Sequence, residues 1–148
     1  MSSSRVSISD LTTEQLLRLR RLGVLNGCGP RSWKRKIPTP HLSSLCEEHD
    51  LAYWQGPYPP KSPEKARDDA DYALYDGMRR YARGLLDMEL MFNDMTYHWT
   101  HPYRYANVAW AVVRWLWSIY LAWWFYLWVR WYGDEHFYQG KWRDPRLI

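Results

Sequence analysis

Apolar residues recur at helical spacing in several segments of the chain, and stretches rich in Gly and Pro separate these segments. The first predicted helix covers Ser9 to Leu22, where Thr12 and Gln15 fit a capping box and Gly23 is a natural stop. A second helix is expected from His41 to Trp54, because apolar residues there return every three or four positions.

A third helix has a strong start signal at Ser62-Pro63-Glu64, which supplies a cap, a Pro at the first position and an acid in the first turn. We expect this helix to end near Arg83, and a further helix to cover Leu85 to Met95. The stretch from Gly27 to Pro40 shows no apolar period and is predicted to be a loop. Together these patterns predict an all-α fold.

The last long segment, Ala106 to Val129, is the candidate for a membrane-spanning helix. It has 24 residues, and its polar members are Asn107, Arg114 and Ser118. At about 1.5 Å per residue it reaches roughly 36 Å, enough to cross an apolar layer of about 30 Å. Since no polar face exists between Trp115 and Val129, a true span is favoured over an interfacial or buried amphipathic helix. Arg114 must then snorkel or pair with a neighbouring chain. We therefore predict a single-pass integral membrane protein.

The composition of the chain indicates which kinds of partner to expect. Seven of the 11 Trp lie between Trp110 and Trp131. Trp normally concentrates at the membrane interface, but here it runs through the whole segment, which indicates packing against helices of other membrane subunits. The formal charge of +4 is spread along the chain without any nucleic-acid motif, so no nucleic-acid partner is expected. Met1 to Leu11 has no apolar core of signal-peptide length, so no cleaved leader is expected.

The candidate chemistry lies in the second predicted helix, in the stretch Cys46-Glu47-Glu48-His49-Asp50-Leu51-Ala52-Tyr53. Residues three and four apart share a face of a helix, so four reactive side chains project to one side. These four are Cys46, His49, Asp50 and Tyr53.

With Cys three residues before His, Asp directly after it and Tyr four residues after it, this stretch resembles the phospholipase A2 superfamily. Upstream, Gly27-Cys28-Gly29-Pro30 sits where that family has its glycine-rich calcium loop. Downstream, the segment from Ala70 to Leu74 resembles the one that returns an aspartate, here Asp71, to the histidine. The resemblance covers residues 24 to 80 and implies a phospholipase A2-like helical module with a calcium-loop-like segment, followed by one transmembrane helix.

The resemblance also implies roles for individual side chains. The neutral imidazole of His49 would act as general base on a water molecule. Asp71 would hold the other ring nitrogen and fix its tautomer, and Tyr53 would hydrogen-bond the Asp71 carboxylate. From position alone, Asp68 and Asp69 are near-equal alternatives to Asp71.

For the metal, the resemblance implies a calcium ion bound by Asp50 and by the backbone carbonyls of Gly27, Gly29 and Arg31, because calcium prefers six to eight oxygen ligands. Arg31 departs from the family pattern, which has a glycine at this place. An arginine adopts positive φ less readily than glycine, and its charge opposes a nearby cation. This departure counts against calcium binding and therefore against catalysis.

The two cysteines allow two interpretations. A pair of free buried thiols is the plain one. The resemblance implies instead a disulfide between Cys28 and Cys46 that joins the loop to the second helix. A disulfide would indicate an oxidising compartment.

The predicted organisation has four parts: an N-terminal helix in residues 1–23, the phospholipase A2-like module in 24–100, the membrane-spanning helix in 101–132 and a polar tail in 133–148. In aromatic composition, charged exit and extended tail, Trp124 to Pro145 resembles short single-pass accessory subunits of mitochondrial complex I.

Two functions compete. The first is an accessory subunit of a large membrane complex, such as a respiratory complex of the mitochondrial inner membrane, whose phospholipase A2-like site is degenerate or binds only lipid. The alternative is an active calcium-dependent, membrane-anchored phospholipase A2 that cleaves glycerophospholipid esters. Phospholipid is an expected partner in both cases. The departure at Arg31 and the Trp-rich span favour the subunit.

Overall fold

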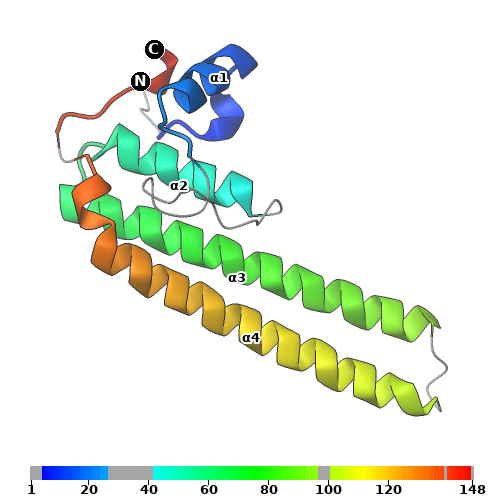
Figure 1. Cartoon of the computed structure of the whole chain (residues 1–148). Helices are drawn as coiled ribbons and strands as arrows, with labels where there is room; N and C mark the ends of the chain where they lie inside the picture. The colour runs from blue at the N-terminus through cyan, green and yellow to red at the C-terminus, as the bar shows by residue number, and fades with distance from the viewer. Residues whose placement is uncertain (1–4, 27–41, 97–100, 139, 148) are drawn as a thin grey trace. The chain divides into compact units, whose positions relative to one another are not determined.

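The computed structural model describes residues 5–26, 42–96, 101–138 and 140–147. Within these ranges the chain forms α-helices and short 3-10 helices and no strand, which confirms the all-α prediction. The elements in chain order are η1 (Ile8–Asp10), α1 (Thr13–Arg21), α2 (Ser43–Gln55), α3 (Pro63–Thr96), α4 (Pro102–Tyr132), η2 (Asp134–His136) and η3 (Pro145–Leu147) (Figure 1).

These elements divide between two compact units. Unit 1 lies within Met1–Leu74 and Val129–Ile148, and unit 2 within Tyr75–Trp128. Each of the long helices α3 and α4 therefore contributes one part to each unit. Unit 1 contains η1, α1, α2 and both ends of the described chain.

The predicted helix from Ser9 to Leu22 is two elements rather than one. Leu11 has an extended backbone between η1 and α1, and this separates the 3-10 turn from the α-helix. The predicted capping box of α1 is confirmed, since the Thr12 hydroxyl accepts from the Gln15 backbone N–H at 3.3 Å and Oε1 of Gln15 accepts from the Thr12 backbone N–H at 2.9 Å. Gly23 follows the helix with a φ of +68°.

The predicted break in α3 is wrong. The helix begins as expected, and the Ser62 hydroxyl accepts from the Lys65 backbone N–H at 3.3 Å. It then runs without interruption past Arg83 to Thr96. Gly84 costs a helix only about 1 kcal/mol relative to Ala, and the hydrogen bonds on both sides of it outweigh this cost. The two helices expected here are therefore one.

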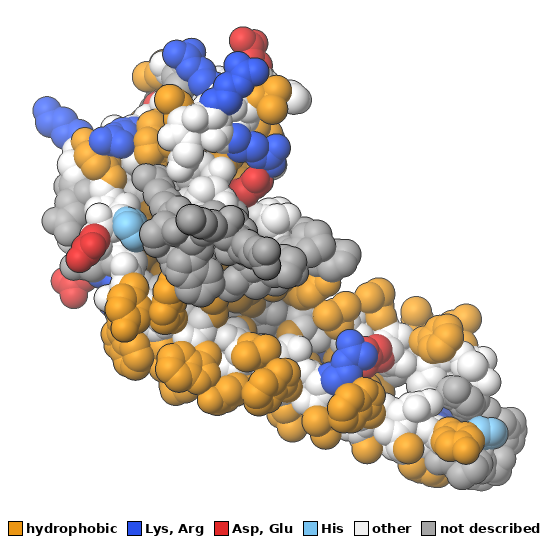
Figure 2. Space-filling view, viewed as in Figure 1, with side chains coloured by type: hydrophobic (Ala, Val, Ile, Leu, Met, Phe, Trp, Pro, Cys, Tyr) orange, Lys and Arg blue, Asp and Glu red, His pale blue; other side chains and the backbone are white. Residues whose placement is uncertain are grey.

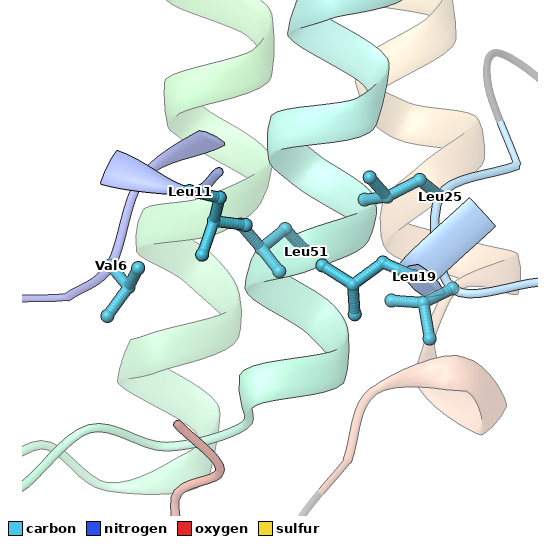
Figure 3. Close-up of a cluster of buried hydrophobic side chains, with 6 residues drawn as sticks. Val6, Leu11, Leu19, Leu25 and Leu51 are labelled. Atoms are coloured by element: carbon cyan, nitrogen blue, oxygen red, sulfur yellow. The ribbon is translucent and has the colours of Figure 1, made fainter. Parts of the chain in front are cut away.

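The core of unit 1 is a cluster of aliphatic side chains from the N-terminal segment and α2. Figure 3 shows these side chains, which come from α2, from α1 and from the residues on either side of α1. The cluster consists of Val6, Leu11, Leu19, Val24, Leu25 and Leu51. Because Leu51 lies on the same helix as His49, this packing fixes α2 from one side.

The C-terminal tail returns to the end of α2. The Tyr138 backbone N–H donates to the Tyr53 carbonyl at 3.1 Å, and the Arg143 backbone N–H donates to the Gln55 carbonyl at 3.0 Å. A Cβ atom on Gly56 would lie 2.5 Å from the Tyr138 carbonyl oxygen, so this approach requires glycine. The tail and α2 thus form one packed structure within unit 1.

Unit 2 is an antiparallel helical hairpin made from residues 75–96 of α3 and 101–128 of α4 (Figure 1). Arg114 pairs with Glu89 across the hairpin at 2.7 Å, and the rings of Tyr75 and Tyr126 have centroids 5.6 Å apart. Arg114 was expected to snorkel or to pair with a neighbouring chain, whereas its partner in the structure belongs to the same chain.

Helix α4 is long and apolar enough to cross a membrane, as the sequence predicted. The qualifying stretch is Tyr103–Tyr132, and only 11% of its most apolar window is buried. A core helix of a globular domain would be mostly buried, so this helix presents its apolar side chains outward. Figure 2 shows hydrophobic side chains gathered over the hairpin.

Two leucines of α1 give a matched test of the unit 1 core. Leu19 is fully buried, whereas Leu17 of the same helix is 47% exposed. We expect Leu19→Ala to lower the free energy of unfolding by about 2–5 kcal/mol, because it removes buried methyl groups and leaves a cavity. Leu17→Ala should change it by less than about 0.5 kcal/mol. Urea unfolding of the full chain in detergent, followed by circular dichroism, measures both, and equal losses would contradict the described core.

Candidate active site

One face of α2 carries the predicted site residues, as helical spacing requires. Cys46 and Tyr53 are buried, and the side chain of His49 is 10% exposed. The third turn of α3 faces them with Asp71, whose side chain is fully buried. All of these residues belong to unit 1.

The structure brings His49, Tyr53 and Asp71 together around one carboxylate oxygen. The distance between Nε2 of His49 and Oδ1 of Asp71 is 2.8 Å. The Tyr53 hydroxyl donates to the same oxygen at 2.5 Å. The His49 and Tyr53 rings also touch, with centroids 4.2 Å apart. The positions expected for these three residues are found, and their catalytic roles stay predictions.

Of the three candidate aspartates, Asp71 is the one that meets the histidine. Asp69 pairs with Lys61 at 2.5 Å and with Lys65 at 3.1 Å, near the start of α3. Asp68 pairs with Arg130 at 2.5 Å. The sequence alternatives are thereby resolved in favour of Asp71.

Two arginines that the sequence analysis did not assign to the site approach the other oxygen of Asp71. Nη1 of Arg130 donates to Oδ2 at 3.2 Å, and Nε of Arg67 lies 3.9 Å from it. Arg67 also donates to the Arg130 carbonyl oxygen at 2.5 Å. Arg67 precedes Asp71 by four residues, a helical spacing that signals an ion pair. Arg130 gives no such local signal, because 59 residues separate it from Asp71.

The surroundings of Asp71 keep it ionised. Burial by itself would raise the pKa of Asp71, but hydrogen bonds from His49, Tyr53 and Arg130 hold that pKa below its ordinary value. Burial raises the pKa of Tyr53, and the neighbouring Asp71 carboxylate raises it further. Tyr53 therefore remains a phenol that donates its hydrogen bond.

This network assigns the tautomer of His49. An ionised carboxylate accepts hydrogen bonds and donates none, so Nε2 of His49 must carry the proton that faces Asp71. In the neutral ring the lone pair is then on Nδ1. A neutral imidazole in this tautomer has its basic nitrogen on the ring atom that does not bond Asp71.

The aromatic ring of Tyr53 is held from the side of the C-terminal segment. Phe137 packs edge-on against it, with centroids 5.3 Å apart. A Cβ atom on Gly133 would lie 2.8 Å from the Tyr53 hydroxyl and 2.4 Å from the Val129 carbonyl oxygen, so the segment after α4 approaches closely only because this residue is glycine. Sequence reasoning did not identify this support.

The predicted calcium site is described in part. Oδ2 of Asp50 accepts from the Asn26 backbone N–H at 3.0 Å, which places this carboxylate at the residue leading into the predicted loop. An aspartate oxygen at that place is a suitable donor for calcium. Gly27, Gly29 and Arg31 lie outside the described residues. Among the described residues, no group of three or more His, Cys, Asp or Glu side chains could hold a metal ion.

Only one cysteine of the predicted disulfide lies within the described residues. Cys46 is buried on α2. Its predicted partner Cys28 lies outside the described residues, as does the predicted loop from Gly27 to Pro40. The pairing of the two cysteines stays a prediction.

Comparisons of this chain with protein-family models, with curated proteins and with solved structures found no match. The likeness to phospholipase A2 therefore depends on the residues named above and on their spacing.

Replacing Asp71 tests the electrostatics of the site. At pH 7 we expect Asp71→Asn to lower the free energy of unfolding by about 3–5 kcal/mol, because it removes the buried carboxylate that accepts from His49, Tyr53 and Arg130. The folded-state pKa of Asp71 lies below its ordinary value, so its stabilising effect is complete above the unfolded pKa of about 3.9. That effect is lost as pH falls through the lower folded-state value.

The difference in stability between wild type and Asp71→Asn should therefore shrink in acid. Urea unfolding at a series of pH values measures it. Asp87→Asn, an exposed position on the same helix, is the control and should cost less than about 1 kcal/mol at any pH. A difference that does not change with pH would contradict an ionised, stabilising Asp71.

Proposed function

We propose that this chain is a membrane-anchored hydrolase of the phospholipase A2 type, in which His49 is the general base. The observation that supports this function best is the hydrogen bond between Nε2 of His49 and the buried carboxylate of Asp71, 2.8 Å long. It leaves Nδ1 as the basic nitrogen of a ring that is 10% exposed. A water molecule bound to Nδ1 would be oriented and activated by this nitrogen.

The reaction follows from these positions. Nδ1 of His49 takes a proton from water while the water oxygen attacks the carbonyl carbon of the ester. The resulting imidazolium is stabilised by Asp71, and it returns the proton to the alcohol oxygen as the ester bond breaks. The products are a fatty acid and a lysophospholipid. Asp50 and the predicted loop carbonyls would hold a calcium ion, which would supply positive charge to polarise the carbonyl and stabilise the oxyanion.

The substrate class follows from the anchor. The apolar, outward-facing helix α4 favours a location at a membrane, where glycerophospholipid esters are concentrated. An enzyme held at the lipid surface needs no transport of its substrate through water.

The histidine test is direct. We expect His49→Gln to reduce calcium-dependent hydrolysis of phospholipid vesicles by the detergent-solubilised chain at least about 100-fold, since it removes the general base. His101→Gln, an exposed histidine at the start of α4, is the matched control and should keep wild-type activity. Release of fatty acid by the purified protein is measured. Equal activity of wild type and His49→Gln would exclude the hydrolase function.

The second candidate is an accessory subunit of a large membrane complex, with respiratory complexes of the mitochondrial inner membrane as the favoured setting. The exposure of large aromatic side chains along α4 supports it, because such a surface fits neighbouring helices as well as lipid. The exposed tryptophans of this helix are Trp110, Trp117, Trp123, Trp124 and Trp131. In that case the same site binds lipid without cleaving it. A stable monomer in detergent with full hydrolysis would exclude this candidate.

Both candidates require α4 to enter the apolar layer. We expect Leu121→Arg, at an exposed apolar position of the helix, to weaken membrane association, because an arginine near the centre of a span costs about 2.5–3.5 kcal/mol. Extraction of membranes with alkaline carbonate separates embedded from released protein. Trp131→Arg near the end of the helix is the control and should remain in the membrane, since its charge can reach the interface. Retention of Leu121→Arg would contradict embedding.

A further inference from the structure

The carboxylate of Asp71 binds three donors, which come from two separate parts of the chain. His49 and Tyr53 reach Oδ1 from α2. Oδ2 faces Arg130, which lies in the last turns of α4 and inside the candidate span Tyr103–Tyr132. All of these groups belong to unit 1. The helix that anchors the chain therefore also contributes a side chain to the His49–Asp71 pair.

We propose that Arg130 is a positioning residue, which fixes the Asp71 carboxylate so that Asp71 can orient His49. This proposal rests on the proposed hydrolase function, because it assigns a role within the same site. It makes the end of the anchor helix a working part of the site in addition to its attachment to the membrane.

The geometry around Arg130 supports this role. Nη1 lies 2.5 Å from Oδ1 of Asp68 and 3.2 Å from Oδ2 of Asp71, so one nitrogen bridges two carboxylates of α3. Nη1 donates a hydrogen bond to Asp71, and its contact with Asp68 is an ion pair. The backbone of Arg130 is also held, because Arg67 donates to its carbonyl oxygen at 2.5 Å. Arg130 is thus fixed at its side chain and at its main chain by α3.

The contact matters because of how a carboxylate moves. With donors only on Oδ1, the Asp71 group could rotate about its Cβ–Cγ bond and move the oxygen that His49 needs. A donor on Oδ2 opposes that rotation, and the planar guanidinium directs its N–H groups more strictly than an ammonium group does. Outer groups that orient a histidine in this way typically change activity 10- to 100-fold when they are removed, on the order seen for other sites.

The position of the neighbouring Arg67 also supports the role of Arg130. Arg67 is the other arginine beside Oδ2, but its Nε is 3.9 Å away, beyond hydrogen-bond distance. Its own guanidinium is engaged with the Arg130 carbonyl. Arg67 therefore cannot take over the position of Arg130 without losing the contact that holds α4.

The test uses three variants of the full chain in detergent. Arg130→Met removes the charge and keeps much of the apolar stem. Arg130→Lys keeps the charge and loses the planar group. Arg146→Met is the matched control, because Arg146 is an exposed arginine of the same unit that pairs with Asp144 away from the site.

Two readouts are measured on each variant. The first is kcat and KM for phospholipid vesicles in calcium. The second is the nitrogen-15 NMR spectrum of the histidine rings at constant pH, in which the His49 signal is assigned by its loss in His49→Gln. This spectrum reports which ring nitrogen carries the proton and needs no catalysis.

We expect Arg130→Met to lower kcat about 10- to 100-fold with KM unchanged, and Arg130→Lys to recover part of that loss. In the spectrum, His49 should be the Nε2–H tautomer in wild type and a mixture of tautomers in Arg130→Met. Arg146→Met should match wild type in both readouts. Wild-type kcat and an unchanged His49 spectrum in Arg130→Met would overturn the proposal, and so would a change in KM alone.

Failure of the hydrolase function gives a different result. If wild type does not hydrolyse phospholipid, the proposed function fails, and the tautomer of His49 alone decides whether Arg130 positions the pair. If Arg130→Met does not fold, Arg130→Lys takes its place, because it keeps the charge and loses the planar group. A lower kcat and a mixed tautomer in Arg130→Lys support the proposal, and wild-type values in both overturn it.

Discussion

The buried carboxylate of Asp71 requires hydrogen-bond donors from other parts of unit 1. A carboxylate removed from water is strongly destabilised unless hydrogen-bond donors replace the lost solvent. Here the donors come from α2 through His49 and Tyr53, and from the end of α4 through Arg130. These elements lie far apart in the sequence, so the chain must fold back on itself before the charge is satisfied. The same arrangement that stabilises the charge also places the imidazole.

The return of the chain depends on two close approaches. Gly133 lets the segment after α4 come against the Tyr53 hydroxyl, and Gly56 lets Tyr138 come against the end of α2. Any larger side chain at either position would collide with backbone or ring atoms. Since Tyr53 donates to Asp71, the packing of the tail and the electrostatics of the site are coupled through one phenol ring. The tail that the sequence marks as polar therefore has a structural role.

The sequence predicts the parts of this structure that depend on neighbouring residues. The capping box at Thr12, the helix start at Ser62 and the common face of His49 and Tyr53 are local patterns, and the structure contains all three. The continuation of α3 through Gly84 was missed because local propensity counts the cost of a glycine without the helical hydrogen bonds on both sides of it. Arg130 was missed for a related reason, since it stands at the end of an apolar run and its partner is distant in the sequence.

The hairpin of unit 2 bears on how α4 meets the membrane. Residues 75–96 of α3, which pack along α4 in this hairpin, expose ion pairs such as Arg79–Asp76 and Arg83–Asp87. Charged pairs of this kind are too costly to expose to lipid tails.

This cost separates the two proposed functions. If α4 spans the membrane while it stays packed on α3, another protein must cover α3, as in a subunit of a complex. If the chain acts alone and α4 spans the layer, α4 must instead separate from α3. Separation would break the ion pair between Arg114 and Glu89, 2.7 Å long, and the ion pair between Arg104 and Asp94. The state of this hairpin in the membrane therefore distinguishes the two functions as directly as catalysis does.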